Sequence, residues 1–142
     1  MREEKIRAIA ICVCRDGERI LVAEGHDSRK RQTFYRPLGG TIEFGERGEE
    51  TVRREFREET GAELLEVKYL GMLENIFTYE GMRGHEIALV YDGHLADKSL
   101  YKKDVIIGDE LGMPFTAIWK RLDEFTPGQS PVYPDGLLEL IG

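Results

Sequence analysis

Apolar and polar positions in the first part of the chain alternate in blocks that predict two paired strands. Residues 5–14 (KIRAIAICVC) are rich in small and β-branched side chains, which is typical of a central strand. Residues 19–24 (RILVAE) predict a second strand, because the Asp16-Gly17 pair between the two runs is a hairpin signal. The polar, basic stretch 26–33 that follows predicts a loop.

The periodicity becomes helical in the middle of the chain. After a short predicted strand at 41–44, residues 49–60 have the spacing of a helix of about three turns. Gly48 is the expected N-cap of this helix. Gly61 suits the left-handed conformation that ends a helix, so the predicted element has a signal at each end.

Strand patterns return in the second half of the chain. Residues 64–79 predict one long bent strand or two short ones, and residues 85–95 a strand that runs back as an antiparallel partner. The polar stretch 97–112 predicts a mobile loop. A short C-terminal helix is expected at 136–141, with Asp135 as its cap.

The central helix carries three glutamates on one arc of its surface. At about 100° per residue, Val52 and Phe56 form a narrow apolar stripe, and Glu55, Glu58 and Glu59 lie together beside it. Carboxylates this close repel one another, so we expect a positive partner, for which Mg²⁺ or Mn²⁺ is the candidate. The alternative is a solvated helix with Glu–Arg pairs four residues apart, which would leave the preceding glycine turn unexplained.

Length and composition suit one globular domain over residues 1–142. The chain is 33% charged with a net charge of −7, which argues against a general nucleic-acid surface. No apolar run approaches the ~20 residues of a membrane span, and no signal peptide is evident. Cys12 and Cys14 are expected to be buried, reduced thiols rather than a disulfide or a zinc site. We therefore expect a cytoplasmic protein with neither a membrane nor a nucleic-acid partner.

The stretch from Gly40 to Ala62 resembles the Nudix box. That motif is a glycine, five residues, a glutamate, seven residues, and then Arg-Glu-apolar-X-Glu-Glu-X-Gly-apolar. The matching positions in this chain are Gly40, Glu46, Arg54, Glu55, Phe56, Glu58, Glu59 and Gly61. Ala62 departs from the larger aliphatic residue that is usual at the last position, a difference that affects packing rather than chemistry.

The resemblance implies an α/β protein of the Nudix fold, in which a mixed β-sheet is sandwiched between α-helices. It implies Mg²⁺-dependent hydrolysis, by water attack on phosphorus, of a phosphoanhydride bond in a nucleoside diphosphate derivative. A nucleoside triphosphate or similar small nucleotide is the expected substrate. The alternative is a nucleotide-sensing module of the same fold without turnover, and a homodimer is a candidate assembly.

The resemblance also assigns roles to single residues. Glu55, Glu58, Glu59 and the carbonyl of Gly39 match metal-ligand positions, and Glu55 and Glu58 match catalytic positions. Glu46 and Arg54 are the residues expected to form a structural ion pair. No carboxylate directly precedes Trp119, where some members carry a general base, so Glu110 in the preceding loop is a candidate and the base stays open.

Substrate-binding residues are expected outside the box. Aromatic and cationic side chains suit a nucleobase and its phosphates. The candidates for contact with the base are Tyr35, Phe77, Tyr79 and His85, and those for phosphate are Arg36, Arg7 and Arg83. An aromatic side chain in a strand is more often part of the core, which is the alternative for each aromatic candidate. The residues carry no signature that selects one nucleotide.

Overall fold

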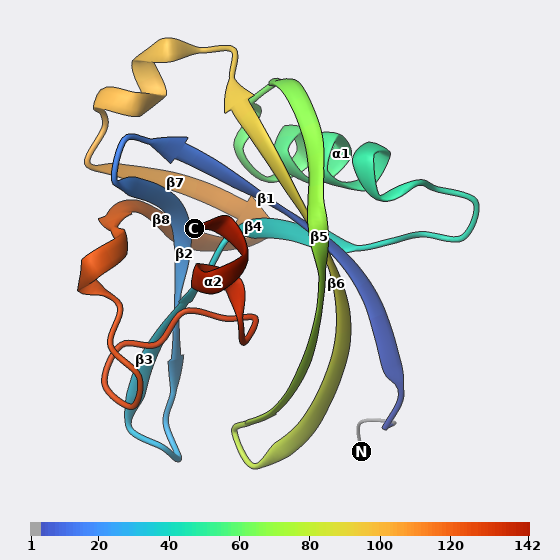
Figure 1. The fold of residues 1–142 in the computed structure, drawn as a ribbon, viewed down its shortest axis with the longest axis vertical. Helices are drawn as coiled ribbons and strands as arrows, with labels where there is room; N and C mark the ends of the chain where they lie inside the picture. Colours follow the sequence, from blue (N-terminus) through green and yellow to red (C-terminus); the bar gives the residue numbers. More distant parts are fainter. Residues whose placement is uncertain (1–3) are drawn as a thin grey trace.

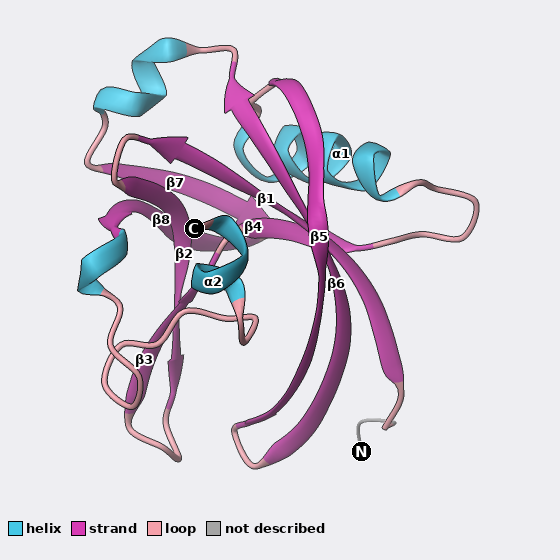
Figure 2. Cartoon of the chain, viewed as in Figure 1, coloured by secondary structure: helices cyan, strands magenta, loops and turns pink. Residues whose placement is uncertain are grey.

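The computed structural model describes residues 4–142 and contains a single mixed sheet with helices on both faces (Figures 1 and 2). The strands are β1 (Ile6–Asp16), β2 (Arg19–Asp27), β3 (Gln32–Arg36), β4 (Leu38–Thr41), β5 (Leu64–Tyr79), β6 (Met82–Leu95), β7 (Val105–Glu110) and β8 (Met113–Arg121). The helices are α1 (Gly48–Thr60), α2 (Leu137–Ile141) and the 3₁₀ helices η1 (Lys98–Lys102) and η2 (Leu122–Glu124).

The sheet combines one parallel pair with antiparallel pairs. The strand order is β5-β6-β1-β2-β8-β7, with β3 added to β2 and β4 added to β1. Strands β1 and β6 are parallel, whereas β4 runs antiparallel to β1. A mixed sheet between helices confirms the predicted α/β fold class.

Alternating residues of β1 contribute to two cores, one on each face of the sheet. Ala10, Cys12 and Cys14 pack with Val52 and Phe56 of α1. The intervening residues Ile9, Ile11 and Val13 pack with Leu137 of α2 on the other face. This period of two is what places α1 and α2 on opposite sides of the sheet (Figure 1).

Both cysteines are buried and free, as predicted. A hydrogen bond with Cys14 and burial both raise the pKa of the Cys12 thiol. A protonated, enclosed thiol is a poor nucleophile and a poor metal ligand. The cysteines therefore serve as small apolar side chains of the core that supports α1.

The central helix matches its prediction at one end and differs at the other. Gly61 has φ 73°, and its N–H donates to the carbonyl of Arg57, as expected for a left-handed helix end. The N-cap is Arg47 rather than Gly48, and its backbone N–H donates to the Glu50 carboxylate at 2.9 Å. A glutamate three residues after the cap thus stabilises the start of the helix.

Two other short elements also differ from their predictions. The strand expected at 41–44 is β4, which ends at Thr41 because residues 38–41 pair with β1 and the chain then leaves the sheet. Asp135 does not cap α2; the N-cap is Gly136 at φ 88°, and the Asp135 N–H donates to the Asn75 side chain instead. In contrast, 64–79 is one strand, as in the first of the two alternatives, with two bulges that bend it.

The mobile loop predicted for 97–112 was wrong. This stretch contains η1 and β7, and β7 forms an antiparallel hairpin with β8. Ile106 is buried, the Tyr101 ring stacks on Trp119 with 5.1 Å between centroids, and the indole N–H of Trp119 donates to the Leu100 carbonyl. The three β-branched residues at 105–107 were a strand signal in the sequence, but the charged residues around them favoured a loop.

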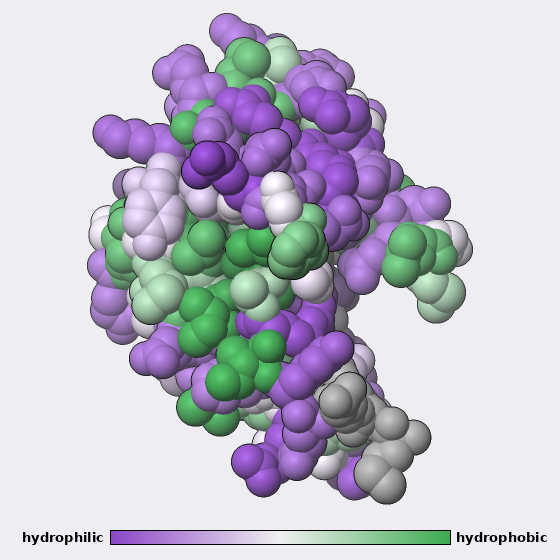
Figure 3. Space-filling model, turned by 90° about the vertical axis from the view of Figure 1, so that its right-hand side faces the viewer, coloured by the Kyte–Doolittle hydropathy of each residue, from purple (hydrophilic) through white to green (hydrophobic). Residues whose placement is uncertain are grey.

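The edge strand β5 carries exposed apolar side chains. The larger ones are Leu65, Tyr69, Leu70, Met72 and Ile76. On the face drawn in Figure 3, polar side chains dominate the upper part and apolar side chains gather below the middle. The predicted homodimer stays a prediction.

A buried aspartate ties two hairpin ends together. Asp27 is 2% exposed, and its carboxylate accepts backbone N–H groups from Arg29 and Lys30 in its own loop and from Glu80 in the β5–β6 turn. Burial opposes ionisation of Asp27, but these three N–H groups outweigh burial and lower its pKa.

We expect Asp27→Asn to lower the Tm by roughly 3–8 °C, because an amide presents N–H groups toward backbone donors. Thermal unfolding followed by circular dichroism measures this shift. The control is Asp104→Asn at an exposed position. Equal Tm values for the two variants would mean that Asp27 does not hold the hairpins together.

Candidate active site

Two glycines of β4 allow the backbone to approach both β1 and the central helix. A Cβ on Gly39 would lie 2.1 Å from the Ala10 carbonyl oxygen, and a Cβ on Gly40 would lie 2.6 Å from the carboxyl carbon of Glu55. The Ala10 oxygen belongs to the backbone and leaves no room for a side chain at position 39, and a side chain at position 40 would displace the Glu55 carboxylate. The glycine pair therefore brings the main chain of β4 against the Glu55 carboxylate.

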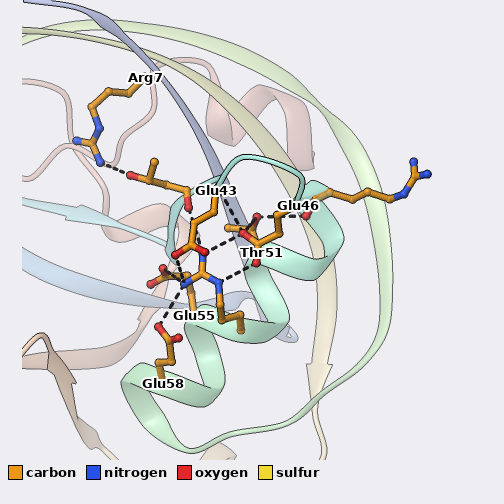
Figure 4. Close-up of polar contacts among 9 residues, drawn as sticks. Arg7, Glu43, Glu46, Thr51, Glu55 and Glu58 are labelled. Carbon is orange, nitrogen blue, oxygen red and sulfur yellow. Dashed lines mark hydrogen bonds and ion pairs between the residues drawn. The ribbon is translucent and has the colours of Figure 1, made fainter.

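Arg54 forms a bidentate ion pair with Glu46 across the loop before α1 (Figure 4). Its Nε donates to Glu46 Oε2 at 2.8 Å and its Nη2 to Glu46 Oε1 at 3.0 Å. The Thr51 hydroxyl donates to the same carboxylate at 2.7 Å. Arg54 and then Thr51 lower the pKa of Glu46 to about 2, against the opposing effect of burial. The pair links the loop at 42–47 to the helix.

The same guanidinium also reaches two of the three helix glutamates. Arg54 Nη1 donates to Glu55 Oε1 at 2.8 Å and to Glu58 Oε2 at 3.2 Å. Pairs of Glu and Arg four residues apart, of which Arg54–Glu58 is one, were expected only as the alternative to a cation site. The structure contains this pair, and it adds a contact of Arg54 with the adjacent Glu55 that was not expected.

Glu59 is the one of the three helix glutamates that Arg54 does not contact. The residue is 7% exposed, and among residues 4–142 its Oε1 atom has no hydrogen-bond partner. Burial and, after it, the nearby charges of Glu55 and Glu110 together raise the pKa of Glu59 to about 8, whereas Arg36 acts in the opposite direction. A buried carboxylate oxygen with no donor is costly unless a ligand or ion satisfies it.

Glu110 reaches this site from the end of β7. The β7–β8 hairpin brings β7 alongside α1, and the Glu110 carboxyl lies close enough to raise the pKa values of both Glu55 and Glu59. Burial is the larger cause of the raised pKa of Glu55, and Arg54 opposes it. The structure thus brings Glu110 close to Glu55 and Glu59, from which it lies far away in the sequence.

The donor set suits a hard divalent cation. Carboxylate and carbonyl oxygens are the ligands that Mg²⁺ prefers, and the orphaned Glu59 oxygen lies among further carboxylates. Within residues 4–142, no three acidic, histidine or cysteine side chains are already drawn together at metal-ligand spacing. Arg54 accounts for part of this, because it holds Glu55 and Glu58 by hydrogen bonds.

Tyr35 and Arg36 lie on opposite faces of β3, so one is buried and the other is exposed. Tyr35 is 8% exposed and packs edge-on against Phe125, while the Lys120 ammonium lies 4.7 Å from the centre of the tyrosine ring. Its ring is therefore part of the core and is not available to stack on a base, contrary to expectation. Arg36 is exposed, and its charge acts on Glu59.

Four of the other candidate substrate-binding residues line one cavity. A cavity of about 310 Å³ is lined by Phe77, His85, Arg7, Arg83, Lys5, Gly84 and Glu86. Tyr79 lies outside this lining and packs edge-on against Phe34, with 5.7 Å between ring centroids. Sequence reasoning missed Glu86, although a charged residue in the apolar run 85–95 was a signal.

A comparison with models of protein families identifies the family of this chain. A model of the NUDIX domain matches residues 4–135. The chain belongs to the Nudix family. Nudix enzymes generally hydrolyse the pyrophosphate link of nucleoside diphosphate derivatives and use divalent metal ions. The predicted family and enzyme class, a Nudix pyrophosphohydrolase, are therefore confirmed.

Several solved structures have a similar fold. The MutT NUDIX hydrolase of Burkholderia pseudomallei is 21% identical, with a TM-score of 0.67 over 97% of this chain and 98% of that one. The ORF135 protein of E. coli is also 21% identical, with a TM-score of 0.57 over 97% and 89%. The mutator MutT protein of Bacillus halodurans is 22% identical, with a TM-score of 0.53 over 83% and 70%.

The Nudix box of this chain spans three structural elements. Gly40 lies in β4, Glu46 lies in the loop, and the remaining matching residues lie in or just after α1. None of the helices in residues 4–142 is long and apolar enough to cross a membrane.

Proposed function

We propose that the protein hydrolyses a phosphoanhydride bond in a nucleoside triphosphate or similar small nucleotide, by water attack on phosphorus, with Mg²⁺ or Mn²⁺ as cofactor. The observation that carries this proposal is the buried, unpartnered oxygen of Glu59 among other carboxylates on the Nudix helix. A structural role does not account for it, because an unpaired buried acid destabilises a fold.

The residues that would hold the cation are Glu55, Glu58, Glu59 and the carbonyl of Gly39. When bound, a divalent cation polarises the phosphoryl group and lowers the pKa of water. Arg54 fixes the rotamers of Glu55 and Glu58 through its hydrogen bonds and so aligns their remaining oxygens. Arg36, which is exposed beside Glu59, is suited to contact phosphate oxygens.

Two carboxylates are candidates for the base that accepts the proton of the attacking water. Glu55 has a pKa raised chiefly by burial, which makes it a stronger proton acceptor than an ordinary carboxylate. Glu110 lies beside Glu55 and Glu59 on an edge hairpin that reaches the site from outside the helix. We favour Glu110, because Arg54 already engages Glu55.

Replacing Glu110 by glutamine is expected to lower kcat by about 10²–10⁴-fold, the range for loss of a general base. Steady-state kinetics at saturating substrate measure this loss. The neighbouring Asp109→Asn is the control, because adjacent strand residues point to opposite faces. If Glu110→Gln keeps near-normal kcat, the base is Glu55 instead.

The proposed function is tested by the hydrolysis products of a nucleotide panel. The panel contains nucleoside triphosphates, ADP-ribose, dinucleoside polyphosphates and nucleotide sugars, each with Mg²⁺, with Mn²⁺ and with EDTA. We expect metal-dependent turnover of the triphosphates or another small nucleotide. Binding without turnover across the panel would favour the nucleotide-sensing alternative. The cytoplasmic location and the absence of nucleic-acid partners stay predictions.

A further inference from the structure

The cavity lined by Phe77 and Arg7 contains a buried carboxylate that the proposed mechanism does not use. Glu86 lines this cavity, and its side chain is 7% exposed. Its one charged partner is Arg7, at 3.5 Å between Nη1 and Oε2, which is too far for a strong hydrogen bond. Among residues 4–142, no hydrogen bond to the Glu86 carboxylate is formed, so its acceptor capacity remains open to a ligand.

The Phe77 ring lines the same cavity and packs against Gly84. A Cβ on Gly84 would come within 2.3 Å of the Phe77 ring, so the ring lies directly against the Gly84 backbone. Phe77 and Gly84 are directly opposite each other in the β5–β6 ladder. One part of the ring is thus supported by main chain while the ring still lines the cavity, which suits it to stack on a planar ligand.

Thr41 connects the cavity to the catalytic cluster. The Arg7 side chain donates to the Thr41 hydroxyl, and Arg54 Nη2 donates to the Thr41 carbonyl at 3.2 Å (Figure 4). Thr41 directly follows the glycine that contacts Glu55. Arg7, the partner of Glu86, is thus linked through Thr41 to the guanidinium that holds Glu55 and Glu58.

We propose that Glu86 selects the base of the substrate and that the preferred substrates are guanine nucleotides. A carboxylate offers two adjacent acceptors, and guanine has two adjacent donors, N1–H and the 2-amino group. Adenine and cytosine each place an acceptor next to a donor on that edge, and uracil has a single donor between two acceptors. Phe77 supplies stacking that does not distinguish bases, and Arg7 holds the Glu86 carboxylate in place.

This inference rests on the proposed function for the orientation of the nucleotide, but base selection can be measured without turnover. The experiment is calorimetric titration with GMP, AMP, CMP and UMP. We expect GMP to bind the wild-type protein at least about 10-fold more tightly than the others. Phe77→Leu is expected to weaken all four by similar factors.

The decisive variant is Glu86→Gln, because a carboxamide has one acceptor and one donor. We expect it to weaken GMP binding by about 10–100-fold and to bring AMP to equal or tighter binding, since adenine complements an amide. Glu86→Asp keeps the charge but withdraws the carboxylate, so it should also lose the preference for GMP. Glu74→Gln, at an exposed position on β5, is the matched control and should behave as wild type.

Two results would overturn the inference: a wild-type protein that does not distinguish the four nucleotides, or a Glu86→Gln variant that weakens all four equally. The second result is what a purely structural Arg7–Glu86 pair would give. Turnover of the nucleotide panel without base preference would remove this inference and leave the proposed function. Selective GMP binding without turnover of any nucleotide would keep this inference and remove the proposed function.

Discussion

Replacing Glu59 by glutamine should lower kcat by at least about 10³-fold while the protein becomes slightly more stable. The Glu59 carboxylate is buried beside Glu55 and Glu110 with one oxygen unpartnered, so its charge destabilises the metal-free fold. A neutral amide of the same shape removes the repulsion, but it also removes the anionic oxygen that we propose as a metal ligand.

The pH dependence of this stability gain follows from the pKa of Glu59. The folded-state pKa of about 8 lies above the usual 4.5, so its protonated form stabilises the fold fully below pH 4.5. That contribution decreases as the pH rises through about 8. Glutamine mimics the protonated form, and its advantage in Tm should therefore be small at pH 5 and largest above pH 8.

Thermal unfolding without metal and steady-state kinetics with Mg²⁺ measure the two effects. Glu49→Gln, which removes an exposed carboxylate on the same helix, is the control and should change neither by much. A Glu59→Gln variant with wild-type kcat would refute the role of Glu59 at the metal site. A lower Tm would show that the Glu59 charge supports the fold.

Replacing Glu46 by glutamine should destabilise the protein by roughly 2–3 kcal/mol at pH 7. Glu46 is held by two hydrogen bonds from Arg54 and one from Thr51, and this contact lowers its pKa to about 2. Because the folded-state pKa is below the usual 4.5, the contribution is complete above pH 4.5. It is lost as the pH falls from about 4.5 toward 2.

Urea unfolding of wild type and Glu46→Gln at pH 7 and near pH 2.5 measures this difference. We expect the gap in unfolding free energy to shrink at the lower pH. Glu63→Gln removes an exposed partner of Arg57 and is the control, with little expected change. A gap that does not depend on pH would mean that Glu46 acts through packing rather than through its charge.

The parts of the fold that the sequence predicted well are those with strict local signals. Gly61 takes a positive φ that few other residues tolerate, so it marked the end of α1. The fixed spacing of Glu55, Glu58 and Glu59 placed them on one arc before any tertiary contact was known. The extended character of residues 64–79 was visible through their apolar content, although the choice between one long strand and two short ones stayed open.

The parts that the sequence did not predict depend on tertiary contacts. Strand β7 pairs with β8 in a hairpin that is local in sequence, but the contact of Ile106 with the core is not local. Tyr35 and Arg36 are neighbours in sequence, so only the register of β3 decides which of them lies in the core. The approach of Glu110 to Glu59 likewise requires the hairpin to fold over α1.

The central claim is that the carboxylates around Glu59 bind a divalent cation, and direct Mn²⁺ binding tests it. Electron paramagnetic resonance measures free Mn²⁺ with and without a non-hydrolysable nucleoside triphosphate analogue. The account predicts that wild type and Glu49→Gln bind Mn²⁺, that Mg²⁺ competes, and that Glu59→Gln binds at least about 10-fold more weakly. Equal Mn²⁺ binding by wild type and Glu59→Gln would contradict it.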